Sequence, residues 1–261
     1  MSRNFDGIDD TINCGQGTSL NALVPGTFMC WIYVNNMPGV GLFSDVITKG
    51  YFAYPTGFLF PFYFQADATG SYLTSGWVQD NGLDNRSQST DYGDIPTKKW
   101  TNIATTIPSN AAITIYRDGK PTADFSSGTS STPPSVNNKD LALGHDAADT
   151  GIAFFDGILA YVQVWNRLLS QNEIIQAMNL PGSVRGSLVF FMPLWGAPIE
   201  GDYSGNKNNG ILTGTTISSL NPPISSVFYI PKPRSEYAAA YTTAAAAVPV
   251  QDLDSFSFFW G

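Results

Sequence analysis

The chain has 261 residues, with 13 basic and 21 acidic side chains that give it a formal net charge of -8 at pH 7. Proteins that bind nucleic acids gather Lys and Arg on the surface that meets the phosphates, so this balance, with Lys98-Lys99 as the one adjacent basic pair, argues against a nucleic-acid partner. Charged residues make up 13% of the chain, roughly half of the usual share, and aromatic residues another 13%, which is typical of a loop-rich β protein.

Short β-type runs separated by turn residues fill the first 180 positions and predict a sandwich or a barrel. Residues 27–34 (TFMCWIYV) are almost all apolar or β-branched, which predicts a central strand covered on both faces. Residues 57–64 are mostly aromatic and also predict a strand. Pro61 interrupts this run and cannot donate a backbone hydrogen bond, so we expect a bulge or a sheet edge there.

Two further runs, 100–107 and 112–116, lead to a hairpin signal. It is the dipeptide Asp118-Gly119, which suits a type I′ turn because both central residues of that turn need positive φ. Residues 126–138 are rich in Ser, Thr and Pro and are expected to form a loop. Later strands are expected at 141–144 and 154–165.

One helix is predicted. Ser170 can accept a hydrogen bond at its start, and Glu173 lies at the third helical position, so the two form a capping box. The helix should cover residues 171–179 and stop at Pro181-Gly182. At this length it depends on packing against the rest of the domain.

The texture of the sequence changes after residue 181. A strand-like run at 187–195 is followed by a turn-rich loop at 202–210, and the chain from Asn221 onward is rich in Pro and Ala. We expect residues 1–180 to form a domain and residues 181–261 to form an extension that packs on it or reaches a partner as an assembly arm. The aromatic residues expected to anchor this arm are Phe256, Phe258, Phe259 and Trp260.

The sequence gives no sign of export or membrane insertion. The first residues turn acidic without an apolar segment, so no secretory signal is expected. No stretch approaches the roughly 20 apolar residues that span a bilayer. Cys14 and Cys30 are interpreted as two half-buried thiols, with a disulfide between them as the alternative.

A series of motifs in chain order resembles the laminin-G-like and pentraxin-like domains of the concanavalin A-like superfamily. The motifs are NFDGIDD at 4–10, WTNIA at 100–104, IYRDGK at 115–120, LG at 143–144, FDG at 155–157 and VWNRLLS at 164–170. The resemblance covers residues 4–180 and implies an all-β fold, a jelly-roll sandwich of two antiparallel sheets with one short helix. Residues 188–194 and 202–214 also look like the leading segment of laminin-G-like domains in phage and environmental virion proteins.

The superfamily includes glucanases, and we tested the sequence for their chemistry. Glycoside hydrolysis needs two carboxyl groups, and the resemblance places them as a Glu-x-Asp-x-x-Glu pattern on one strand. The chain has three Glu, namely Glu173, Glu200 and Glu236, and none of them pairs at strand spacing. His145 is the only histidine and is expected as a loop residue at a strand end, which leaves neither a serine triad nor a zinc site. We therefore expect no enzyme.

The resemblance also raises the question of calcium, since many members of the superfamily bind it through loop carboxylates and carbonyls. Relatives often carry acidic residues in the strand after Phe-x-Gly, where this chain has the apolar sequence ILAY at 158–161, which counts against the family's metal site. No cofactor is expected, and Ca²⁺ is the one ion with candidate ligands. These are Asp9, Asp10, Asp146, Asp149 and Asp156.

Glycan binding is the commonest non-enzymatic activity that the resemblance implies. Trp77, Tyr92 and Tyr72 lie in a polar, loop-like stretch at 67–94 and could stack on sugar rings. The alternative is that these aromatic residues belong to the core.

Two functions follow. The first is a non-enzymatic structural protein of a bacteriophage virion, a capsid decoration (cement) or tail-associated subunit. It would assemble in the host cytoplasm with partners such as the major capsid protein, as a homo-oligomer for which a trimer is the working symmetry. The alternative is a glycan-binding module of a receptor-binding or cell-surface protein. Neither involves nucleic acid or a membrane.

Overall fold

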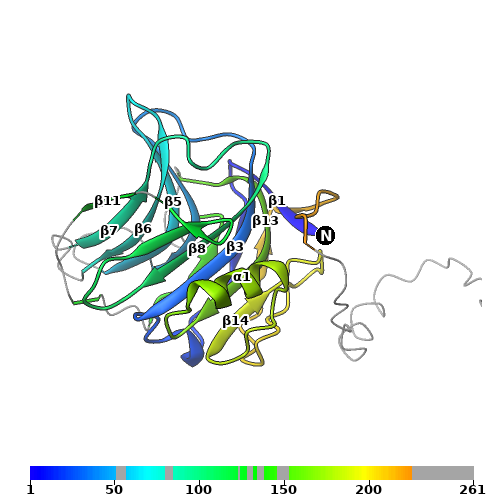
Figure 1. Ribbon diagram of the computed structural model, residues 1–261. Coiled ribbons are helices and arrows are strands. Elements are labelled where there is room, and N and C mark those ends of the chain that lie inside the picture. Colours follow the sequence, from blue (N-terminus) through cyan, green and yellow to red (C-terminus); the bar gives the residue numbers. More distant parts are fainter. Residues whose placement is uncertain are drawn as a thin grey trace, which may run out of the picture. The chain divides into compact units, whose positions relative to one another are not determined.

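A computed structural model describes residues 1–50, 57–79, 85–122, 124–127, 132–133, 138–145 and 153–224. In this part of the chain two antiparallel β-sheets face each other across a hydrophobic core, and one α-helix lies outside them (Figure 1). The predicted all-β sandwich with one short helix is confirmed.

The first sheet is centred on β3 and β13, the two longest strands in it. Its order is β10 (Lys120–Pro121), β9 (Thr114–Arg117), β8 (Trp100–Ile107), β3 (Gly26–Val34), β13 (Asp156–Trp165), β1 (Ser2–Asp6) and β16 (Thr216–Ser218), with β14 (Leu188–Met192) also paired to β13.

The second sheet contains the strands that position the candidate site. Its order is β11 (Asp124–Ser127), β7 (Asn85–Thr90), β6 (Ser71–Val78), β5 (Phe58–Ala66), β4 (Phe43–Lys49), β12 (Leu141–Leu143), β2 (Thr11–Asn13) and β15 (Ile211–Thr213). A single turn of 3₁₀ helix, η1 (Thr18–Leu20), follows β2.

The core forms because alternate residues of each strand point toward the opposite sheet. Phe28, Cys30 and Ile32 of β3 enter it from the first sheet, and residues such as Phe62 and Trp77 enter it from the second. One polar contact also crosses between the sheets, a 2.9 Å hydrogen bond that joins the buried hydroxyls of Ser75 and Thr105. As predicted, β3 is a central strand, with all its residues buried except Tyr33.

The helix α1 (Gln171–Asn179) has the predicted bounds and the predicted capping box between Ser170 and Glu173. The pKa of Glu173 is lowered to about 2, mainly by its hydrogen-bonded ion pair with Arg167 and to a smaller extent by the hydrogen bonds from Ser170. The helix covers the outer face of the first sheet, where the indole N–H of Trp31 donates to the carbonyl of Met178 at 3.2 Å (Figure 1).

Two local predictions about turns and bulges are confirmed. Asp118 and Gly119 both have positive φ, at 50° and 75°, and form the turn between β9 and β10. The pairing of β5 with β6 shifts register between Phe60 and Tyr63, so Pro61 lies in a bulge. Because β5 is flanked by β4 and β6, the alternative of a sheet edge at Pro61 is excluded.

Several strands differ from the sequence predictions. The stretch at 67–94, expected to be loop-like, contains β6 and β7, and β4 had no predicted counterpart. Hydroxyls of β6 and β7 meet across the pair, as in the 2.8 Å bond between Thr74 and Ser89. The expected loop at 126–138 begins inside β11.

The predicted domain boundary at residue 180 is also corrected. β14, β15 and β16 all lie beyond it, and each pairs with a strand from the N-terminal part of the chain or with β13. The compact unit therefore runs from Met1 to Ser225. The assembly-arm residues Phe256, Phe258, Phe259 and Trp260 lie outside the described residues.

Cys14 and Cys30 are free thiols, as predicted, and the alternative disulfide is absent. Both are buried more completely than expected, and this burial raises the pKa of each thiol. No helix in the described part of the chain is long and apolar enough to cross a bilayer.

Candidate functional site

A groove lies on the outer face of the second sheet, on the side opposite to α1. Ile12 and Leu212 point into the core or pack against it, so their neighbours Thr11, Asn13 and Thr213 point outward, where they line the groove. The cavity has a volume of about 790 Å³. We call it the polar groove, after six of its lining residues, Asp9, Thr11, Asn13, Asp140, Lys207 and Thr213; apolar residues such as Phe154 and Ile211 also line it.

Neighbouring groups hold several polar side chains of the groove in place. Asn13 donates from Nδ2 to Asp140 Oδ2 at 2.8 Å and accepts the backbone N–H of Gly15 at its Oδ1. Asn208 donates to Ser19 and to Asp202, at 2.9 and 3.0 Å. Fixed donors and acceptors of this kind orient a bound ligand.

One aromatic pair forms part of the wall. The rings of His145 and Phe154 lie 3.9 Å apart between centroids and are tilted by 33°. His145 follows β12 after Gly144, as expected of a strand end, and it is only 2% exposed, with the ring of Phe154 packed against it. Phe154 is half-buried and lines the groove.

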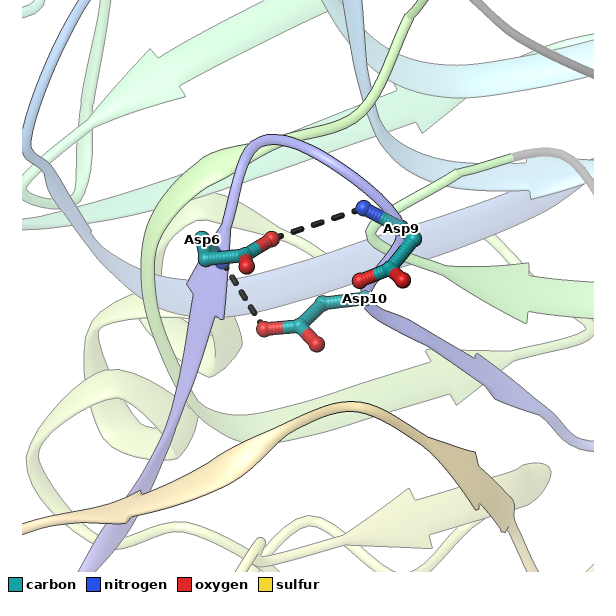
Figure 2. A group of neighbouring side chains, drawn as sticks. All are labelled: Asp6, Asp9 and Asp10. Atoms are coloured by element: carbon teal, nitrogen blue, oxygen red, sulfur yellow. Dashed lines mark hydrogen bonds between the residues drawn. The ribbon is translucent and has the colours of Figure 1, made fainter.

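Three carboxylates meet at the turn between β1 and β2 (Figure 2). One oxygen from each of Asp6, Asp9 and Asp10 lies within 4.8 Å of the others. Asp10 Oδ2 accepts the backbone N–H of Asp6 at 2.9 Å, and Asp6 Oδ1 accepts that of Asp9 at 3.4 Å. Burial, aided by the charges of Asp6 and Asp9, raises the pKa of Asp10 above its ordinary value, although the hydrogen bond from Asp6 opposes this effect.

The chain brings only part of the predicted calcium set together. Asp9 and Asp10 are neighbours, whereas Asp156 lies opposite Asp6 on β13, outside the cluster, and accepts hydrogen bonds from the side-chain amides of Asn35 and Asn36. Asp6 completes the cluster and was missed, although the close spacing of three Asp in one turn was visible in the sequence. Oxygen donors of this kind fit a hard cation such as Ca²⁺. The candidates Asp146 and Asp149 lie outside the described residues.

If Ca²⁺ binds to these three carboxylates, it should stabilise the folded protein. Free Ca²⁺ at about 100 times its dissociation constant adds about 2.7 kcal/mol to the free energy of unfolding, which is a rise of roughly 5–10 °C in the thermal midpoint for a domain of this size. Thermal unfolding with Ca²⁺, with Mg²⁺ and with a chelator measures it. The Asp9→Asn variant should lose the rise, and equal midpoints in Ca²⁺ and chelator would refute the prediction.

The three residues predicted to bind glycans do not form one platform. Trp77 is fully buried in the core and cannot offer a face to a sugar, so its assignment is corrected. Tyr72 and Tyr92 do meet edge to face, with ring centroids 5.3 Å apart. Tyr92 is 43% exposed and donates its hydroxyl proton to Asp67 Oδ2 at 2.7 Å.

A row of aromatic side chains on the outer face of β4 and β5 was missed as a surface feature. Tyr63 lies 5.8 Å from Phe43 and 5.1 Å from Phe60 between ring centroids. Phe43 is 46% exposed, whereas Phe60 is buried in a small cluster separate from the main core. The aromatic run at 57–64 contained the signal for this row. Successive residues of a strand point to opposite faces, so when residues such as Phe62 point into the core, other aromatic residues of the run must point outward.

Comparison with known proteins gives one family. The family model described as the concanavalin A-like lectin/glucanases superfamily matches residues 6–175. A comparison with curated protein sequences gives no match.

Solved structures with a similar fold include a putative carbohydrate binding protein from Bacteroides ovatus, with 18% sequence identity, a TM-score of 0.51 and coverage of 86% of this chain. This chain spans 61% of that protein's length. The heptameric SAP-like pentraxin from Limulus polyphemus has 14% identity, a TM-score of 0.47, and coverage of 67% of this chain and 80% of its own. The enzymatically active domain of tailspike protein 2 from bacteriophage CBA120 has 16% identity, a TM-score of 0.44, and coverage of 69% and 27%. At these identities the likeness concerns the fold alone.

Proposed function

Because this chain belongs to the concanavalin A-like lectin/glucanases superfamily, we propose that it is a non-enzymatic glycan-binding domain and that the polar groove is its binding site. The observation that carries this proposal is the lining of the groove. The groove that the ring of Phe154 helps to line also offers the hydroxyls of Thr11 and Thr213, together with amides and a carboxylate that neighbours already orient. Sugars present hydroxyl groups at their edges and C–H faces between them, which match these two kinds of partner.

The proposal of a non-enzymatic domain rests on the roles of the glutamates. Glu173 is bonded to Arg167 and Ser170 at the start of α1. Glu200 is 2% exposed and paired with Arg3. Neither lines the polar groove, and Glu236 lies outside the described residues. These structural contacts of both described glutamates support the proposal, because a hydrolase needs carboxyl groups that can act on the substrate as acid and base.

Replacing Phe154 by Ala should weaken glycan binding roughly 5- to 10-fold, because an aromatic contact contributes on the order of 1 kcal/mol beyond its area. The measurement is binding of the purified protein to a glycan array, followed by calorimetric titration of a bound glycan. Tyr92→Ala is the matched control, since Tyr92 belongs to the other exposed aromatic surface. The reverse result, with Tyr92→Ala weakening binding and Phe154→Ala leaving it unchanged, would move the site to the Tyr72–Tyr92 pair. Thermal unfolding checks that both variants fold.

A structural role in a bacteriophage virion is the second candidate. It is supported by the sequence beyond Ser225, which is rich in Pro and Ala and ends in aromatic residues suited to docking on a neighbour. The expected partners are other virion proteins such as the major capsid protein, and the expected state is a homo-oligomer. Co-purification with assembled particles, followed by imaging of the labelled protein on them, tests this role. If assembled particles lack the protein, the proposed virion role is refuted.

A further inference from the structure

We propose that the polar groove selects uncharged glycans and rejects acidic ones, such as those that carry sialic or uronic acids. This inference rests on the proposed glycan-binding function and adds the class of ligand. It follows from the charges that line and surround the groove.

Carboxylates outnumber cations along the groove. Asp9 and Asp140 line it directly, and Lys207 is the one cation among the described residues that does so. Asp9 also lies in the cluster with Asp6 and Asp10, which adds two more carboxylates beside the same end of the groove.

Asp202 adds a further carboxylate near the groove, since its side chain accepts a hydrogen bond from the lining residue Asn208. Burial, followed by the charges of Asp202 and Asp140, raises the pKa of the Cys14 thiol, whose side chain points into the core beside the groove. An acidic sugar placed in the groove would be repelled by the carboxylates of Asp9 and Asp140, which line it.

The nearby cations offset only part of this charge, although the ammonium of Lys49 does interact with the charge of Asp140. The ammonium of Lys49 donates to the backbone carbonyl of Lys139 at 2.6 Å, and Lys49 is buried on β4 and is not part of the groove lining. Arg3 is paired with Glu200 on the first sheet. A glycan without charge avoids the repulsion and can still donate its hydroxyl protons to Asp9 and Asp140, because ionised carboxylates only accept hydrogen bonds.

The test compares glycans that differ only in charge. Sialylated lactosamine and its asialo form make one pair, and an oligogalacturonide and its methyl ester make another, each titrated in a chelator-containing buffer. We expect the uncharged member to bind at least roughly 10-fold more tightly at about 20 mM salt, and the difference to shrink at about 500 mM salt as the charges are screened.

Charge-removing variants locate the effect. Asp9→Asn and Asp140→Asn should each reduce the preference for the uncharged glycan several-fold. Asp91→Asn removes the same charge from an exposed position just beyond β7, near the opposite edge of the second sheet, and should leave the preference unchanged.

The two proposals fail in different ways. If no glycan on an array of both classes binds, the proposed function falls. If glycans bind through Phe154 but the acidic member of each pair binds equally well or better at low salt, the glycan-binding function stands and the inference about charge is overturned.

Discussion

A chain that ends after residue 180 should fail to fold, whereas a chain that ends after Ser225 should keep the whole sandwich. The shorter chain loses β14, β15 and β16, and with them the fully buried side chains of Phe190, Phe191, Met192 and Leu194. Each large apolar side chain contributes roughly 1.5–3 kcal/mol when buried, so these four alone approach the total stability of a domain, about 5–15 kcal/mol. Circular dichroism and thermal unfolding of both chains measure the difference.

The chain that ends at Ser225 is the control, and it also tests the assembly arm. It contains the compact unit complete, so its thermal midpoint should match that of the full chain. The sequence prediction that the C-terminal region mediates assembly then applies to residues 226–261. Light scattering should show that the full chain is an oligomer and that the chain ending at Ser225 is not. Cooperative unfolding of the 1–180 chain near the midpoint of the full chain would show that β14–β16 are dispensable.

The sequence predicted elements whose signals are local. The capping box of Ser170 and Glu173 lies within four residues, and Asp118-Gly119 is a turn by itself, so both predictions hold. β6 and β7 were missed because hydroxyls such as those of Thr74 and Ser75 are satisfied by partners on other strands, far away in the sequence. The bond between Thr74 and Ser89 joins positions that no local pattern connects. Trp77 was wrongly predicted to bind glycans for the same reason. Its side chain can be assigned to the core only once β6 is known to be a strand.

The candidate site could be predicted only in part, for the same reason. The Asp6–Asp9–Asp10 cluster lies in a single turn and was half recognised. The polar groove takes its lining from segments far apart in the sequence, such as Thr11, Asp140 and Thr213. They come together because β2 pairs with both β12 and β15. Sequence spacing carries no trace of that pairing, and the last of these strands lies in the region predicted to be an extension.

Replacing Glu200 by Gln should lower the free energy of unfolding by about 3–5 kcal/mol, the usual effect of removing one partner of a buried ion pair. Arg3 Nε and Glu200 Oε1 are 2.7 Å apart, with side chains 5% and 3% exposed. The same carboxylate accepts the backbone N–H groups of Trp195 and Gly196, at 3.1 and 2.8 Å. A neutral amide at this position leaves the positive charge of the Arg3 guanidinium uncompensated. It also replaces one carboxylate oxygen, an acceptor, by an NH₂ group, which is a donor facing the N–H donors of Arg3 and of the backbone. Urea unfolding measures the loss.

The exposed pair of Arg117 and Asp94 provides the matched control for this prediction. Its side chains are 42% and 25% exposed, so Asp94→Asn, which makes the same change from acid to amide, should cost no more than about 1 kcal/mol. Replacing both Arg3 and Glu200 by apolar residues of similar volume should recover much of the loss, because no buried charge then remains unpaired. An equal, small cost for Glu200→Gln and Asp94→Asn would contradict the prediction. The expected large cost arises because Arg3, which also donates to the carbonyls of Ala197 and Thr215, joins β1 to the segments on either side of β15.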